Sequence, residues 1–387
     1  MMISPEFELL LLSCRLDDAG EVVAEAREII ENNQVNWEDL YARADFHYIK
    51  PQLWNLLKKL PSSFIAADFH EKLREAIQDN MLRQLRYVAE FFQIREWLET
   101  EGIIVIPYKG FILGETMYGN LGARESYDID LFIDVSDLER IKAIMAGKGY
   151  RLHETLAELT DEYIFRELAE YNFDRYEEEV CMAHVEFHWR SSMSFYGMGI
   201  GMNDLSSQVV TGIIQGKEIK IFSPAANLLL AVMHHGGKEC FYQLKQVLDI
   251  AQILKCHPGM DTEWLFRQTK RFHMNSLLML GVRLASELTG VPVPTAFQES
   301  VKRKHIARMA EGRIRLTTRP VNELKNYKES LASWVFKIRS RDGLAMKADL
   351  CRYTLRKVVA PRMVPGRWRH HFFNRSIRKN PATLNGV

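Results

Sequence analysis

Two aspartates separated by one residue, Asp128 and Asp130, stand in an apolar run that ends at Val135. The run is typical of a β-strand, so both carboxylates project from one side while Ile129 and Leu131 face the other way. Adjacent carboxylates repel each other, and Mg²⁺ relieves this because it takes oxygen ligands. The spacing predicts a metal site, with a solvated strand edge as the alternative. Replacing either aspartate by Asn is then expected to keep or raise metal-free stability.

Positive charge lies just before this strand. Lys109 and Gly110 follow an apolar segment at 103–107 and open a predicted short helix at 111–118. A helix N-terminus offers unpaired backbone N–H groups to phosphate. Arg124 adds a planar guanidinium that binds phosphate oxygens in pairs, and Lys109 adds a compact charge. We therefore expect Lys109, Gly110 and Arg124 to bind the phosphates of a nucleotide.

This stretch resembles the signature of the uncharacterised nucleotidyltransferase family, the group labelled NTP-transferase 5. In that family an L-K-G, a helix ending in Tyr, an Arg and a D-x-D-L follow in order. The matching residues here are Tyr108-Lys109-Gly110, Tyr118, Arg124 and Asp128-Ile129-Asp130-Leu131, with Tyr108 where Leu is usual, and the match extends to 184–189 and 234–254. The resemblance implies a small mixed-sheet fold that transfers a nucleoside monophosphate.

The resemblance also assigns a role to Glu186, because a third carboxylate on a neighbouring strand completes the metal site in this superfamily. Asp128, Asp130 and Glu186 are thus the expected catalytic residues and ligands of Mg²⁺, with Mn²⁺ as an alternative. Where the acceptor is a hydroxyl, Glu186 is also the expected general base. Lys109 departs from the superfamily, which usually has Gly-Ser there, and this leaves the phosphate geometry and the activity of this branch open.

Two histidines flank Glu186, and His184, Glu186 and His188 share one face of a predicted strand at 180–189. With His234 or His235 they could instead hold Zn²⁺ or Mn²⁺ in a hydrolase, because imidazole suits softer metals. Three ligands on one strand point in parallel, so they converge poorly on one ion. The pattern favours a packed His188, or one hydrogen-bonded to a carboxylate.

A later stretch, His-His-Gly-Gly-Lys at 234–238, lies between predicted helices at 225–235 and 241–255. We expect His234 or His235 to line the nucleotide pocket and Lys238 or Lys245 to reach the triphosphate. A purely structural interpretation remains open.

In that structural interpretation, Gly236 and Gly237 end the first helix. Lys245 then pairs with Asp249, which lies four residues later on the same helix face.

The predicted elements divide the chain into three regions. They are an N-terminal helical region at 1–101, a nucleotidyltransferase-like α/β core at 102–222, and a C-terminal helical region with a basic tail at 223–387. Strands are predicted at 103–107, 129–135, 150–153, 172–176, 180–189 and 218–222, and Ser136 is predicted to cap a helix at 136–147. The predicted fold class is α+β, with a small mixed sheet flanked by helices.

Composition is that of a soluble globular protein, with 47% hydrophobic and 26% charged residues among 387. We find no apolar run long enough for a membrane span and no signal-peptide pattern, so a cytoplasmic location is expected. Five cysteines without a C-x-x-C spacing predict reduced thiols. Basic residues predominate after Arg339, and this tail could contact an anionic partner or form a solvated helix face.

The resulting hypothesis is Mg²⁺-dependent transfer of a nucleoside monophosphate from an NTP, expected to be ATP, to an unidentified acceptor hydroxyl or phosphate. Two alternatives stay open. One is a non-catalytic nucleotide-binding or scaffold protein. The other is an RNA-modifying, toxin-like nucleotidyltransferase, whose binding would weaken steeply with salt.

Overall fold

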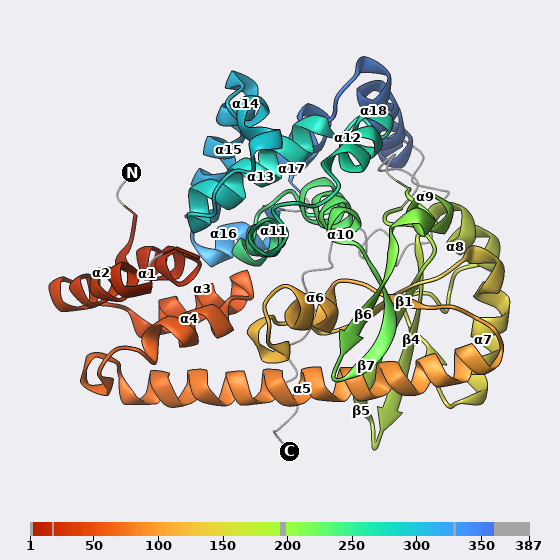
Figure 1. The fold of residues 1–387 in the computed structure, drawn as a ribbon, viewed down its shortest axis with the longest axis horizontal. Helices are drawn as coiled ribbons and strands as arrows, with labels where there is room; N and C mark the ends of the chain where they lie inside the picture. The colour runs from red at the N-terminus through yellow and green to blue at the C-terminus, as the bar shows by residue number, and fades with distance from the viewer. Residues whose placement is uncertain (1–2, 18, 194–198, 328–329, 360–387) are drawn as a thin grey trace.

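A mixed β-sheet lies among helices in the computed structural model, which describes residues 3–17, 19–193, 199–327 and 330–359 (Figure 1). The strand order is β1-β2-β5-β4-β3. The strands are β1 (Ile106–Pro107), β2 (Ile129–Phe132), β3 (Arg151–Leu152), β4 (Glu170–Glu177) and β5 (Val180–His188). Strands β2 and β5 are parallel, while the other neighbours are antiparallel. The predicted α+β class with a mixed sheet is confirmed.

The two faces of the sheet differ in chemistry. Ile129 and Leu131 of β2, together with Val185 and Phe187 of β5, are fully buried in an apolar core. That core also contains residues of α5 (Ala67–Thr100), α7 (Leu138–Gly147) and α8 (Asp161–Glu167). On the other face, Asp130 of β2 and His184, Glu186 and His188 of β5 are polar, as the sequence predicted for β5, whereas Phe132 at the end of β2 is buried in the core of the helical regions. Helix packing therefore covers one face and leaves part of the other for polar side chains.

Helix α5 connects the sheet to the helical regions, because it contributes to the hydrophobic core of each. Its first half places Phe69 and Leu73 in the core of the helical regions, and its second half places Phe91 and Ile94 in the core of the sheet. Figure 1 shows the helix running beneath both parts. With 34 residues it is about 50 Å long at 1.5 Å per residue. The N-terminal helical region is thus fastened to the sheet by a continuous helix.

The N-terminal and C-terminal helices share one hydrophobic core. The backbone N–H of Leu16 donates to the carbonyl of Thr289 across it, at 2.8 Å. The N-terminal helices before α5 are α1 (Pro5–Ser13), α2 (Ala19–Asn32), α3 (Trp37–His47) and α4 (Lys50–Leu57). The later helices are α10 (Pro224–Ala231), α11 (Leu244–Cys256), α12 (Thr262–Arg271), α13 (Asn275–Thr289), α14 (Gln298–Val301), α15 (Lys304–Thr317), α16 (Val321–Lys325), α17 (Leu331–Arg339) and α18 (Leu344–Val359). The three-region division remains a prediction.

A hairpin of β6 (Val209–Ile214) and β7 (Lys217–Phe222) stands beside the sheet, and the sequence predicted only its second strand. Gln215 and Gly216 both have positive φ, at 48° and 75°. Such values are typical of the two-residue hairpin turns that match strand twist. The turn residues therefore carried a signal for the missing strand.

Two predicted helix starts had different outcomes. Ser223 caps α10 by accepting the Ala226 N–H at 3.3 Å, with Pro224 at the first helical position, as predicted. Ser136 is not an N-cap, which corrects the prediction. Strand β2 ends early, and Asp134 accepts the Ser136 N–H at 2.9 Å to begin a 3₁₀ turn, η3 (Val135–Asp137), before α7.

Within the described ranges, no helix has the length and apolar content needed to cross a bilayer. The basic stretch after residue 359 lies outside the described residues, so its contact with an anionic partner stays a prediction.

His47 at the end of α3 predicts a pH dependence of stability. Its side chain is fully buried, and its Nδ1 accepts the Leu244 N–H at 3.2 Å. Burial and the nearby Arg43 lower the pKa of His47 to about 3. Between pH 6.5 and 3 the unfolded chain binds a proton that the folded chain does not, so stability falls as pH falls. From pH 6.5 to 5.0 this costs roughly 2 kcal/mol.

Urea unfolding at both pH values measures this loss. His47→Asn keeps an acceptor for the Leu244 N–H but does not titrate, so it should lose about 2 kcal/mol less than the wild-type protein. His305→Asn removes an exposed imidazole and serves as the matched control. Equal losses in wild type and His47→Asn would contradict the account.

Candidate active site

The parallel pairing of β2 with β5 places Asp130 directly opposite Glu186. His188, two residues further along β5, lies with its Nε2 2.9 Å from Asp130 Oδ1 and 3.3 Å from Glu186 Oε2. One donor atom from each of the three side chains lies within 4.8 Å of the others. Two of the predicted carboxylates therefore meet, and His188 hydrogen-bonds a carboxylate as the sequence favoured.

Asp128 occupies the residue position two before Asp130, just ahead of β2. Its side chain is half-buried, whereas Asp130 is only 4% exposed. The Ser126 hydroxyl donates to Asp128 Oδ1 at 3.0 Å. Asp128 thus keeps partial access to solvent at the margin of the buried carboxylate pair.

Lys109 stands at the start of the short helix α6 (Gly110–Thr116) in an unusual backbone conformation. Its φ is 60° and its ψ is −144°, a region that favours glycine and costs a lysine of order 1–3 kcal/mol. The ammonium lies 3.0 Å from Asp130 Oδ1 and 4.4 Å from the centre of the Tyr108 ring. The backbone of Lys109 therefore adopts a conformation typical of glycine, while its side chain contacts the Asp130 carboxylate.

The buried charges compensate one another. Burial alone would raise the pKa of Asp130, but Lys109 and His188 lower it below its usual range. Burial likewise opposes the charged form of Lys109, yet Asp130 raises the pKa of that ammonium well above its ordinary value. Burial and Lys109 disfavour imidazolium at His188, but contacts with Asp130 and Glu186 raise its pKa. The site is thus a network of ionised carboxylates and cations.

A further polar row on β4 was missed from the sequence. Glu170, Asn172 and Asp174 pair in register with His188, Glu186 and His184, respectively. The signal was present, because E-Y-N-F-D at 170–174 alternates polar and apolar residues as β5 does. The polar face of the sheet is therefore wider than the sequence indicated.

The two histidines of β5 share Glu186, and each also contacts carboxylates that the other does not. His184 contacts Asp174 Oδ1 at 2.6 Å and Glu186 Oε1 at 3.2 Å, while His188 also reaches Glu170 Oε2 at 3.4 Å. Although burial disfavours the imidazolium, contacts with Asp174 and Glu186 raise the pKa of His184 to about 10.

Arg124 forms a buried cluster with Asp249 of α11. Its Nε and Nη2 each donate to Asp249 at 2.8 Å, and its Nη1 donates to the Gly110 carbonyl at 3.2 Å. Tyr118 and His235 also contact Asp249, at 2.8 and 2.9 Å. Burial raises the pKa of Asp249, but Arg124 and His235 lower it overall. The guanidinium predicted to bind phosphate is thus paired with Asp249, and it contacts the Lys109–Gly110 turn through the Gly110 carbonyl.

Lys245 has no salt bridge to Asp249, so the predicted pair is not formed. Its ammonium lies 5.0 Å from the centre of the Tyr48 ring. Burial and Arg124 lower the pKa of Lys245 to about 8, while Asp249 and Asp128 act in the opposite direction. The Asp128 carboxylate is therefore close enough to Lys245 to favour its charged form.

The His-His-Gly-Gly-Lys stretch forms a π-helical segment, η6 (Val232–Lys238), that continues α10. The prediction that Gly236 ends the first helix is therefore wrong. A Cβ at Gly236 would lie 2.5 Å from the Phe241 ring, so close packing explains this glycine. His234 is half-buried with its Nδ1 3.3 Å from that of His235, and Lys238 ends the segment half-buried. Single π turns often occur at functional sites.

Comparison with known proteins decides the family. The family described as uncharacterised nucleotidyltransferase matches residues 33–290. The chain belongs to this nucleotidyltransferase family. A search of curated proteins finds no match. A solved structure, that of ANT(2")-Ia in complex with adenylyl-2"-tobramycin, aligns with 48% of this chain and 95% of its own at 12% identity and a TM-score of 0.34.

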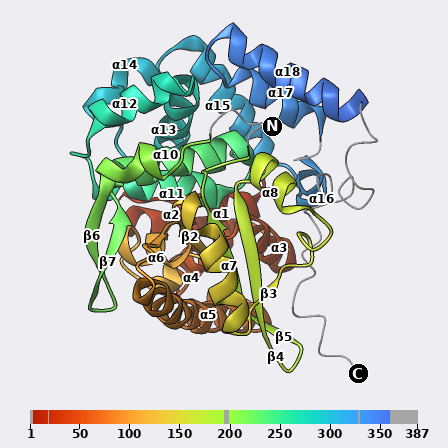
Figure 2. The same ribbon diagram turned by 90° about the vertical axis from the view of Figure 1, so that its right-hand side faces the viewer.

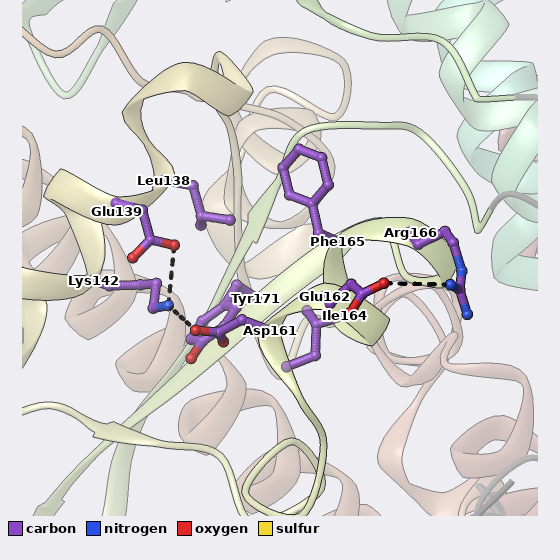
Figure 3. A pocket seen from close by; sticks show the side chains of 9 residues that line it. All are labelled: Leu138, Glu139, Lys142, Asp161, Glu162, Ile164, Phe165, Arg166 and Tyr171. Carbon is purple, nitrogen blue, oxygen red and sulfur yellow. Dashed lines mark hydrogen bonds and ion pairs between the residues drawn. The ribbon is translucent and has the colours of Figure 1, made fainter.

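A cavity of about 330 Å³ in this nucleotidyltransferase is lined by residues of α7, α8 and β4 (Figure 3). Leu138, Ile164 and Tyr171 line it, and Lys142, which also lines it, contacts Glu139 and Asp161. Tyr171 alternates along β4 with the polar row, so the cavity lies on the apolar side of the sheet. It contains none of the predicted site residues.

The buried pair of Arg124 and Asp249 predicts a large effect on stability. Asp249→Asn would leave the guanidinium buried without a counter-charge, which typically costs about 3–5 kcal/mol. Glu31→Gln, which breaks the exposed pair of Arg27 and Glu31, should cost less than about 1 kcal/mol. Denaturant unfolding of both variants compares them, and equal small losses would contradict the role given to Asp249.

Proposed function

We propose that this protein transfers a nucleoside monophosphate from an NTP, with ATP as the expected donor, to a hydroxyl or phosphate of an acceptor and releases pyrophosphate. Membership of the nucleotidyltransferase family supports transfer chemistry of this kind. The observation that carries the proposal is the register that sets Asp130 against Glu186, with Asp128 two residues before Asp130. Carboxylates gathered from neighbouring strands suit divalent cations that act on phosphates.

The donor set of this chain fits such a cation. Asp128, Asp130 and Glu186 offer carboxylate oxygens, which Mg²⁺ prefers. His188 offers an imidazole nitrogen in the same group, and imidazole suits softer ions, which keeps Mn²⁺ in the proposal. When bound, the cation would neutralise charge on the phosphate oxygens and on the leaving pyrophosphate.

In the proposed step, a bond forms between the acceptor oxygen and the α-phosphorus. The bond from that phosphorus to the bridging oxygen breaks, and pyrophosphate leaves with its electron pair. The proton of an acceptor hydroxyl passes to Glu186. Burial raises the pKa of this carboxyl, but hydrogen bonds with His184 and His188 hold it well below its usual range, so Glu186 is ionised before the step.

The remaining predicted residues have proposed roles around the nucleotide. Lys109 is the proposed phosphate contact, because its ammonium already lies at the carboxylate pair. Lys245 is proposed to meet the triphosphate, since a phosphate would favour its charged form. Arg124 is proposed to act through Asp249 and Gly110, and the bidentate pair holds it in that place. His234 and Lys238 remain proposed pocket residues.

The carboxylates are tested most cleanly at Asp128. Asp128→Asn should lower pyrophosphate release by roughly 100-fold or more, the scale of losing one electrostatic stabiliser of the transition state. Labelled NTP, Mg²⁺ and a cell extract that supplies the acceptor give the assay. Glu139→Gln, on the exposed surface of α7, is the matched control. Full activity in a double Asp128→Asn, Asp130→Asn variant would rule the proposal out.

Asp130 is less suitable for this test. The repulsion argument from the sequence does not hold for it, because its carboxylate contacts both Lys109 and His188. Asp130→Asn would leave these two buried cations with one counter-charge fewer, so its stability should fall rather than rise.

The same assay separates the alternatives. A labelled small molecule, protein or RNA in the extract identifies the acceptor. Metal-dependent NTP binding without any labelled product would favour the non-catalytic alternative. Labelled RNA, with binding that weakens steeply with salt, would favour the RNA-modifying one.

A further inference from the structure

Strand β3, labelled in Figure 2, forms one edge of the sheet. A second group of side chains with donor atoms suited to a metal ion lies on the polar face at this edge. Asp174 of β4 and His184 of β5 are opposite each other in register. His153 follows β3, and its backbone N–H donates to the Asn172 carbonyl of β4 at 2.9 Å. One donor atom each from His153, Asp174 and His184 lies within 4.8 Å of the other two. We propose that these three residues bind a divalent transition metal ion, Zn²⁺ in preference to Mg²⁺.

The donor types select this class of ion. Two imidazoles and one carboxylate suit Zn²⁺, whereas Mg²⁺ prefers oxygen ligands and retains its waters. Tetrahedral Zn²⁺ with bonds near 2.1 Å places its donors about 3.4 Å apart. The distances here fall on either side of that value, at 2.6 Å from His184 Nδ1 to Asp174 Oδ1 and 3.8 Å from His153 Nε2 to Asp174 Oδ2. The ion would replace the proton that His184 Nδ1 shares with Asp174, so binding releases a proton, and small side-chain rotations would complete the site.

The outer partner of His184 matches that of a metal ligand. A ligating histidine usually gives its other N–H to a carboxylate or another oxygen. His184 Nε2 lies 3.2 Å from Glu186 Oε1, which can accept that N–H. His153 differs, because its Nδ1 accepts the Thr155 backbone N–H at 3.2 Å. For His153 Nε2 to bind the ion, the ring proton would move to Nδ1, where the Thr155 hydroxyl, 2.8 Å away, can accept it.

Asn172 provides an independent sign of a ligand on this face. It lies between Glu170 and Asp174 on β4, opposite Glu186, and is only 3% exposed. Its amide oxygen has no hydrogen-bond partner among the residues that the structure describes. Buried polar atoms are nearly always satisfied, so a water or an ion on this polar face would complete the hydrogen bonding of this oxygen.

An ion can reach the group from solvent. The side chains of His153 and His184 are 24% and 13% exposed, whereas Asp174 at 5% forms the floor. Three protein ligands leave a fourth position open, which is the ligand number of zinc sites that bind water or substrate. The group shares no ligand with Asp128, Asp130 and Glu186, so its occupancy is measurable without nucleotide transfer.

Metal titration of the full-length protein tests the proposal. The protein is stripped with a chelator, held in excess Mg²⁺ to occupy oxygen-ligand sites, and titrated with Co²⁺ as a spectroscopic substitute for Zn²⁺. We expect about one equivalent to bind with visible absorption of a low-coordinate nitrogen–oxygen site, and Zn²⁺ to displace it. His153→Ala and Asp174→Asn should each weaken binding by more than the roughly 10- to 100-fold typical of losing an outer partner.

Two exposed residues give matched controls. His305→Ala removes an exposed imidazole, and Glu139→Gln removes an exposed carboxylate, so both should bind Co²⁺ as the wild type does. Circular dichroism checks that each variant is folded, and the isosteric Asp174→Asn guards against a misfolded His153→Ala. Unchanged binding in folded His153→Ala and Asp174→Asn, or equal loss of binding in the two controls, would overturn the proposal.

Discussion

The constraint on which the structure depends is the burial of carboxylates on one face of a small sheet. Asp130, Glu170, Asp174 and Glu186 are each less than 10% exposed. A buried charge costs several kcal/mol unless it is paired and hydrogen-bonded. Lys109, His184 and His188 supply the compensating groups from α6 and β5. The opposite face of the sheet packs on α5, α7 and α8 and supplies the apolar core. The face with the carboxylates can therefore carry charged side chains.

A second buried and compensated carboxylate, Asp249, connects the sheet region to the helices that follow it. Asp249 of α11 is fully buried and accepts from Arg124, Tyr118 and His235. Arg124 also holds the carbonyl of Gly110, at the turn that carries Lys109. The position of the Lys109 ammonium at the carboxylates thus depends on the ion pair between Arg124 and Asp249. A nucleotide site assembled this way would be sensitive to substitutions outside the polar face.

The sequence predicted those features that depend on local pattern. The alternation around Asp130 and Glu186 gave both strands and their polar faces, and the order of Lys109, Arg124 and the aspartates gave the family. It could not give the register of β2 against β5, because pairing between distant strands is set by tertiary packing. The structural partner of Arg124 was missed for the same reason, since Asp249 lies 125 residues away. Gly236 misled the helix prediction because its role is close packing, which no single sequence displays.

A crystal structure of the protein with Mn²⁺ and a non-hydrolysable ATP analogue tests the central claim most directly, because anomalous scattering locates the ion. The account predicts Mn²⁺ bound by Asp128, Asp130 and Glu186 with the α-phosphate beside it, and the Lys109 ammonium turned from Asp130 to a phosphate oxygen. An ion and triphosphate bound elsewhere, with the contact between Lys109 and Asp130 unchanged, would contradict it.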